Sequence, residues 1–218
     1  MIVRWRFTAM LLAIGSGLSS VAAAQLLEIA EGVHYQVIDP PVAATAEPGQ
    51  IEVTELFWYG CPRCAELEPM MTSWGNYLRG DLALTRSPVV WHEIMRTHAR
   101  IFYVAERLRV LQDVHAAAFK AIAEHDQPLQ SEQQIEALFA AHGVDAQRFS
   151  EAWNHPEVFA AVDDAAQRTK AYFAEQLPAL IVNGRYRVSL NEAVPTLDEM
   201  VISVNLLIRQ LREVRRSD

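Results

Sequence analysis

The two cysteines of this chain, Cys61 and Cys64, are three positions apart and are the only cysteines among its 218 residues. An apolar, β-prone run over residues 53–59 precedes them, Gly60 ends that run, and a helix-compatible run over residues 65–78 follows. This arrangement predicts that the pair lies at a strand-to-helix junction, with Cys61 near the helix N-terminus. Unpaired backbone N–H groups and the positive end of the helix dipole favour a thiolate there, and the thiolate is the reactive form of cysteine.

The two residues between the cysteines fit such a position. Cysteines at positions i and i+3 of the first helical turn are close enough to form a disulfide. Pro62 suits the first helical position, where its missing N–H is no loss. Arg63 adds a permanent positive charge, which is predicted to lower the pKa of the Cys61 thiol further. A group that stabilises the thiolate stabilises the reduced form, so the disulfide becomes a stronger oxidant.

Three other interpretations of the cysteine pair stay open. A zinc site would need two more ligands, and neither another cysteine nor a His-x3-5-His spacing follows in the sequence. An inert structural disulfide usually closes a longer loop. Buried free thiols would need no particular position. The strand-to-helix junction favours a redox-active pair over all three.

The N-terminal residues have the pattern of a secretory signal peptide. Arg4 and Arg6 form a basic region, residues 7–18 are apolar, and small residues follow up to Ala24. We predict a signal peptide over residues 1–24, cleaved after the last of these alanines. The apolar run is shorter than the ~20 residues that a membrane span needs. The mature protein is therefore predicted to be soluble and exported, in a compartment where disulfides persist.

Length and charge narrow the class of protein. Cleavage after Ala24 would leave 194 of the 218 residues, enough for one sizeable domain or a domain with an insertion. With Arg4 and Arg6 removed, 17 basic and 27 acidic side chains remain, a net charge of −10. This negative charge argues against nucleic acid as a partner.

The run from Ile51 to Tyr59 is nearly all apolar or β-branched, and it is predicted to be a central strand buried on both faces. Glu55 is the exception within it. One interpretation places Glu55 in solvent at a sheet edge. The other places it under the active site as a partly buried carboxyl with a raised pKa, able to pass protons to the second cysteine. The next predicted strand, Leu82 to Val90, carries Arg86, which is either solvated or the partner of Glu55.

From Trp91 to about Asp163 the hydrophobic pattern has a helical period only, and it predicts a series of helices. Ser131 opens one of them with a capping box, and Asp145 caps another. Six histidines in this part lack metal-ligand spacing and are predicted to be ordinary surface or helix-end residues. They are His92, His98, His115, His125, His142 and His155. No metal site is predicted.

The last third of the chain returns to strand patterns. An apolar run from Leu177, an Asn-Gly turn at residues 183–184 and a second run to Val188 predict a β-hairpin. A final amphipathic helix is predicted from Thr196 to Val214, opened by a capping box. The predicted order is two strands, a helix, a strand, a series of helices, a hairpin and a last helix.

This order, with the runs Phe-Trp-Tyr-Gly-Cys-Pro-Arg-Cys and Leu-Pro-Ala-Leu-Ile-Val-Asn-Gly-Arg-Tyr, resembles the DsbA family of periplasmic thiol:disulfide oxidoreductases. The resemblance covers nearly all of the chain after the signal peptide. It implies an α/β, thioredoxin-like fold with an inserted all-helical domain. The expected parts are a first thioredoxin-like part over residues 25–90, the helical insertion over 91–163 and a second thioredoxin-like part over 164–218.

The resemblance also implies roles for the site residues. Cys61 is expected to be the exposed nucleophile, and Cys64 the buried resolving thiol. Pro178 is expected to be a cis-proline that faces the disulfide, preceded by Leu177, at a site where backbone groups pair with an extended substrate peptide. Glu55 matches an acidic residue of the family.

Two positions depart from the family pattern, and one further position matches it. Arg63 stands where the best-known members carry His, and Leu177 stands where Val or Thr is usual. The dipeptide between the cysteines tunes the redox potential, and the residue before the proline bears on substrate preference. Arg86 matches a basic position of the family near the acidic residue.

The function that the resemblance implies is that of an enzyme, a monomeric dithiol oxidase without metal or organic cofactor. It would introduce disulfide bonds into reduced, unfolded exported proteins through a Cys61–Cys64 disulfide. Its reoxidation implies a partner, a quinone-linked membrane protein of the DsbB type. Two alternatives stay open. One is a disulfide reductase or isomerase of the same fold, and the other is a peptide-binding holdase whose disulfide is structural.

Overall fold

The structure is a computed structural model that describes residues 29–78, 80–125 and 127–217. The predicted signal peptide, residues 1–24, lies outside the described residues. The described elements follow the predicted order. In chain order they are β1 (Gln36–Val37), β2 (Ile51–Phe57), α1 (Pro62–Asn76), β3 (Leu82–Pro88), α2 (Glu93–Leu108), α3 (Leu111–His125), α4 (Glu132–Ala141), α5 (Ala146–Trp153), α6 (Pro156–Ala171), β4 (Ala179–Val182), β5 (Tyr186–Ser189) and α7 (Leu197–Ser217).

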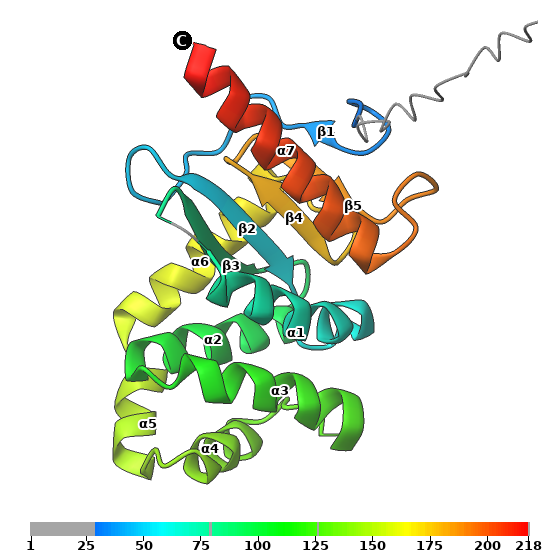
Figure 1. Cartoon of the computed structure of the whole chain (residues 1–218). Coiled ribbons are helices and arrows are strands. Elements are labelled where there is room, and N and C mark those ends of the chain that lie inside the picture. Colours follow the sequence, from blue (N-terminus) through cyan, green and yellow to red (C-terminus); the bar gives the residue numbers. More distant parts are fainter. Residues whose placement is uncertain (1–28, 79, 126, 218) are drawn as a thin grey trace, which may run out of the picture.

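The strands form one sheet in the order β1-β5-β4-β2-β3, shown in Figure 1. β2 runs parallel to β3 and antiparallel to β4, and all of its residues are buried, as predicted for a central strand. β2 ends at Phe57, two residues before the predicted end, because the chain turns there. In that turn the Cys61 N–H donates to the Trp58 carbonyl at 2.9 Å. The turn places the cysteine motif directly beyond the carboxyl end of the central strand.

Helices cover both faces of the sheet, and α7 crosses one of them (Figure 1). Side chains alternate between the faces of β2, so Ile51 and Val53 pack with residues of α1, β4 and α7 in one hydrophobic cluster. Leu56 points to the other face and packs with residues that include Met95 and Tyr172. Glu55 has the same parity as Ile51 and Val53, and it therefore faces α1.

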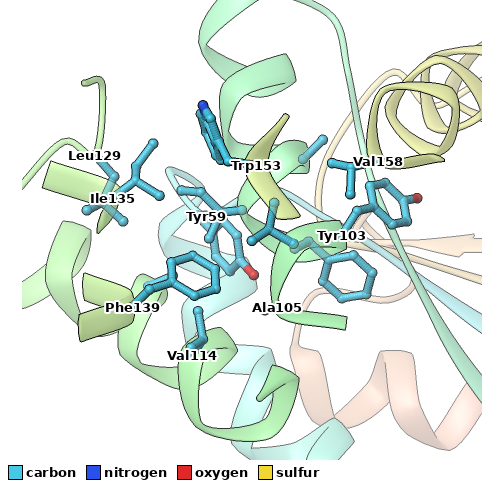
Figure 2. Close-up of a cluster of buried hydrophobic side chains, with 14 of the residues drawn as sticks. Tyr59, Tyr103, Ala105, Val114, Leu129, Ile135, Phe139, Trp153 and Val158 are labelled. Carbon is cyan, nitrogen blue, oxygen red and sulfur yellow. The ribbon is translucent and has the colours of Figure 1, made fainter. Parts of the chain in front are cut away.

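The helices from α2 to α5 gather beyond one end of the sheet (Figure 1). Their buried side chains form a cluster that continues into the active-site turn, and Figure 2 shows Tyr59 inside it. Cys61 and Cys64 belong to the same cluster. The helical part thus shares its hydrophobic core with the redox motif. The expected boundary at residue 163 falls inside α6, which runs without a break from Pro156 to Ala171; the division into parts stays a prediction.

Local signals place several element ends where the sequence predicts them. Ser131 accepts the Gln134 N–H in a complete capping box at the start of α4. Asp145 caps α5. The β4–β5 hairpin turns at Asn183 and Gly184, both with positive φ. A Cβ on Gly184 would lie 1.8 Å from the Val42 carbonyl oxygen, so this close approach requires glycine. Among the described residues, every helix is too short or too polar to span a membrane.

Candidate active site

Cys61 and Cys64 form a disulfide at the start of α1. Cys61 is the N-cap of this helix, and Pro62 occupies its first turn, as the sequence predicts. The Cys61 Sγ accepts the Cys64 N–H at 3.1 Å. Cys61 is 9% exposed, whereas Cys64 is 0% exposed. Only the Cys61 sulfur therefore offers an approach from solvent, and a helix N–H points at it.

Arg63 lies on the exposed side of the same turn. Its Nη1 forms an ion pair with Glu66 Oε2 at 2.6 Å. The sequence predicts a permanent positive charge beside the Cys61 sulfur, and in the structure this charge is paired with the Glu66 carboxylate. The helix N-terminus is thus the group that bears most directly on the sulfur, with Arg63 secondary to it.

The chain segment before β4 contains the predicted substrate-binding residues Leu177 and Pro178. The Leu177–Pro178 peptide bond is cis, as expected from the family resemblance. Leu177 packs against the hydrophobic cluster that contains both cysteines, and β4 begins one residue after Pro178. The placement of Pro178 opposite the disulfide stays a prediction.

Glu55 is fully buried, at 0% exposure. Its Oε2 accepts the Arg86 Nε–H at 3.1 Å, and its Oε1 has no partner among the described residues. The interpretation that places this carboxyl in solvent is wrong, and Arg86 is its partner. Burial raises the pKa of Glu55 to about 8, against the opposing charge of Arg86 and with a further push from Glu68. Below that pH the side chain carries a proton.

Glu68 completes this buried group, and sequence reasoning missed it. It lies four residues after Cys64, one turn further along the same face of α1. Its carboxylate accepts hydrogen bonds from Arg86, from the Thr72 hydroxyl and from His115. Burial alone raises the pKa of Glu68, but the His115 bond and these other partners outweigh burial and lower it. The i, i+4 spacing from Cys64 was the available signal.

His115 links Glu68 to the active-site turn. Its Nε2 lies 3.1 Å from Glu68 Oε2, and its Nδ1 lies 2.9 Å from the Tyr59 hydroxyl oxygen. Burial lowers the pKa of His115 against the opposing effect of Glu68, so we assign a neutral ring that donates from Nε2 and accepts from the Tyr59 O–H. Tyr59 is itself buried, and its pKa is raised by burial and by the charge of Glu68.

The prediction that all six histidines lie at the surface or at helix ends is wrong for two of them. His98 and His115 are each 3% exposed. The other four do mark helix ends: His92 and His155 are N-caps, His142 is a C-cap and His125 is the last residue of α3. Helical periodicity placed His98 and His115 on helices, but it did not tell which face turns inward.

A cavity of about 750 Å³ opens beside the buried charges, between α1, β3 and α3. Glu68, Arg86 and His115 line it, as do Asp113 and His142. The cavity gives the buried carboxylate a route to solvent that does not pass the disulfide. Among the described residues, no group of three or more His, Cys, Asp or Glu side chains is placed to hold a metal ion.

A family model described as a DSBA-like thioredoxin domain matches residues 43–201. The chain belongs to this family. Two curated relatives are thiol:disulfide interchange proteins DsbA. That of Pseudomonas aeruginosa is 33% identical over 171 residues, 78% of this chain and 81% of its own, and that of Azotobacter vinelandii is 33% identical over 183 residues, 84% of each.

Solved structures of the family agree with the fold. The P. aeruginosa DsbA crystal structure has a TM-score of 0.81 at 30% identity and covers 86% of this chain and 97% of its own. The Xylella fastidiosa oxidoreductase DsbA has a TM-score of 0.76 at 28% identity, with 83% and 96% covered. The predicted family and the predicted thioredoxin-like fold with helical insertion are confirmed.

Proposed function

We propose that this protein introduces disulfide bonds into reduced exported proteins, with Cys61 as the sulfur that substrates attack. The chain is a thiol:disulfide oxidoreductase of the DsbA family, and its redox centre is the Cys61–Cys64 disulfide. One observation carries the direction of the reaction. The Cys61 sulfur caps α1 and accepts the Cys64 N–H, so a thiolate at Cys61 is stabilised in the reduced form.

The reaction has two exchange steps. A substrate thiolate attacks the Cys61 sulfur, a bond forms between these two sulfurs, and the Cys61–Cys64 bond breaks. Cys64 leaves as a thiolate and takes up a proton. A second thiolate of the substrate then attacks the substrate sulfur of the mixed disulfide. The substrate keeps the new disulfide, Cys61 leaves as a thiolate, and the enzyme has gained two electrons.

Glu55 is our candidate for the group that donates a proton to Cys64. It is buried, it carries a proton below a pH of about 8, and its Oε1 has no partner among the described residues. A neutral carboxyl that shares Arg86 with Glu68, one helical turn after Cys64 on α1, would serve as a general acid for the buried leaving thiolate. Arg86 bonds to both Glu55 and Glu68, so Arg86 and Glu68 set the electrostatic environment of Glu55. Both also line the cavity that opens to solvent.

The remaining parts of the proposal rest on family likeness. Leu177 and Pro178 would bind the extended substrate chain beside the disulfide. A quinone-linked membrane protein of the DsbB type would reoxidise the reduced pair, and the enzyme would act as a monomer in the periplasm. The signal peptide predicted over residues 1–24 would direct it there and would be cleaved after Ala24.

The direct test follows disulfide formation in a reduced peptide with two cysteines. Stoichiometric oxidised protein should form the peptide disulfide while its own pair becomes reduced. Cys64→Ser, mixed with the disulfide-linked dimer of a peptide that has a single cysteine, should accumulate a mixed disulfide at Cys61, because neither Cys64 nor a second cysteine in the bound peptide is present to release it. Cys61→Ser is the matched control and should accumulate none. Stable mixed disulfides at Cys64 instead would reverse the assigned roles.

A further inference from the structure

Trp58 and His98 form a part-buried contact at the active-site turn that the exchange steps do not use. The Trp58 Nε1–H donates to His98 Nδ1 at 2.9 Å, and the two rings are nearly parallel, 27° apart. His98 Nε2 in turn lies 3.1 Å from the Pro128 carbonyl oxygen, to which it donates. Trp58 belongs to the active-site turn, His98 to α2 and Pro128 to the connection between α3 and α4. The helical insertion thus holds one aromatic side chain of the active-site turn.

The Trp58 indole lies across Gly60, the residue before Cys61. A Cβ on Gly60 would stand 2.4 to 2.7 Å from three atoms of the indole, so the ring rests on the glycine backbone. The Trp58 carbonyl also accepts the Cys61 N–H at 2.9 Å. The indole is half-buried, and it packs against the same two hydrophobic clusters as Leu177. A half-buried aromatic side chain is therefore part of the active-site turn, three positions before the cysteine that substrates attack.

We propose that Trp58 is an apolar wall that binds the substrate chain next to its attacking cysteine, and that His98 is the positioning residue that fixes this wall. The inference deepens the proposed function and rests on it. An attacking sulfur must approach Cys61 along the disulfide axis, which brings its flanking residues over the groups beside Cys61. Reduced, unfolded proteins expose apolar residues, and a fixed indole binds them at low cost in side-chain entropy. The preferred substrate segment is thus one with an apolar residue adjacent to its cysteine.

The positioning role of His98 follows from its surroundings. The ring is 3% exposed and holds both of its nitrogens in hydrogen bonds, one to the indole and one to the backbone. The Tyr59 ring also packs against it, 6.1 Å between centroids. An indole without its acceptor would have to leave its N–H unpaired or turn toward solvent, and the wall would lose its fixed orientation.

The test compares two reduced peptides of equal length, one with leucine and one with serine beside each cysteine. Single-turnover oxidation by stoichiometric oxidised protein gives a half-saturation concentration and a limiting rate for each. His98→Leu should raise the half-saturation concentration for the leucine peptide about fivefold, the value of one lost hydrogen bond, and that for the serine peptide much less. His98→Asn should restore most of the preference, because its side-chain oxygen can replace Nδ1 as acceptor.

Two further variants keep the test decisive. Trp58→Phe, which removes the indole N–H, should repeat the loss, and the double variant with His98→Leu should add little to it because both remove one bond. Trp74→Phe is the matched control: it removes an indole N–H bond to Asn205 on α7, and the preference should stay unchanged.

The outcomes separate the inference from the proposed function. Equal losses for both peptides, or additive losses in the double variant, would show a merely structural contact and overturn the inference. An unchanged leucine preference in a folded His98→Leu or Trp58→Phe protein would overturn it as well. If the unsubstituted protein oxidises neither peptide, the proposed function fails, and this inference with it.

Discussion

Two arginine–carboxylate groups flank the first turns of α1, and they differ in their access to water. Arg63 pairs with Glu66 on the surface, with side chains 47% and 53% exposed. Arg86 pairs with Glu55 and Glu68 beneath the helix, where the side chains are 20%, 0% and 10% exposed. Arg63 of the surface pair stands two positions after Cys61, whereas Glu68 of the buried group stands seven positions after it.

This difference shows that the distance of a charged group from the cysteine motif does not by itself predict how strongly the group affects pKa values and stability. Water screens an exposed ion pair, and its net contribution is small. A buried group is screened much less, so it shifts the pKa values of its neighbours and leaves a costly unpaired charge when one partner is removed. We therefore expect the more distant arginine to matter more for stability, and the nearer one to have only a small effect on the thiol.

The largest expected effect is on stability. Arg86→Met should lower the free energy of unfolding by about 3–5 kcal/mol, because it removes the cation that pairs with the buried Glu68 carboxylate and the donor that bonds to Glu55. Arg63→Met, the same change on the surface, should alter it by no more than about 0.5 kcal/mol. Urea unfolding of both variants in the oxidised form at pH 7 measures the contrast. Equal losses would remove the distinction between the two groups.

The next effect is a change in pH dependence. The pKa of Glu55 is raised from 4.5 to about 8 in the folded protein. Folding therefore binds a proton, and the stability from this group is complete below the unfolded pKa and lost as pH rises through the folded pKa. The free energy of unfolding should fall by about 1.4 kcal/mol per pH unit from this source between pH 5 and 8. Glu55→Gln should abolish that slope.

Glu68→Gln provides a control of opposite sign. The pKa of Glu68 is lowered in the folded protein. Its stabilising contribution is therefore present above the unfolded pKa and is lost as pH falls through the folded one. Glu68→Gln should flatten the acid side of the stability profile and keep a slope from Glu55 of the same sign, which ends at a lower pH because the charge of Glu68 no longer raises the pKa of Glu55. Melts of both variants across the pH range decide whether the two buried carboxyls act in these opposite ways.

The smallest expected effect concerns the reduced enzyme. Arg63→Ala should raise the pKa of the Cys61 thiol only slightly, because Glu66 already offsets the charge of Arg63. Glu66→Ala should shift it in the other direction by freeing the arginine. Thiolate absorbance titrations of the two variants measure this. A large rise in Arg63→Ala would mean that the side chain leaves Glu66 for the thiolate when the disulfide opens.

Features set by neighbouring residues were open to prediction from the sequence. The strand-to-helix junction of Cys61, the Asn183 turn and the capping box of Ser131 each depend on a few adjacent positions, and the structure has all three. The Arg63–Glu66 pair is equally local, at i, i+3, and could have been predicted from the same spacing. The cis peptide bond before Pro178 was predicted from the family resemblance and not from the neighbouring residues.

Features that join distant segments were not open to the same reasoning. Glu55 meets Arg86 because β2 and β3 pair in that register, and Glu68 joins them only through the packing of α1 on the sheet. His98 and His115 became visible as buried residues only once α2 and α3 were placed against the active-site turn. Periodicity gives the helix, but the partner that a helix face meets is a property of the whole fold.

The central claim is that the Cys61–Cys64 pair is a redox-active oxidant whose reduced form is stabilised at the start of α1. The equilibrium of this pair with reduced and oxidised glutathione at pH 7 tests it most directly. We predict a potential above about −200 mV, so that glutathione readily reduces the disulfide. A potential below about −300 mV, the range of structural disulfides, would contradict the claim and favour the holdase alternative.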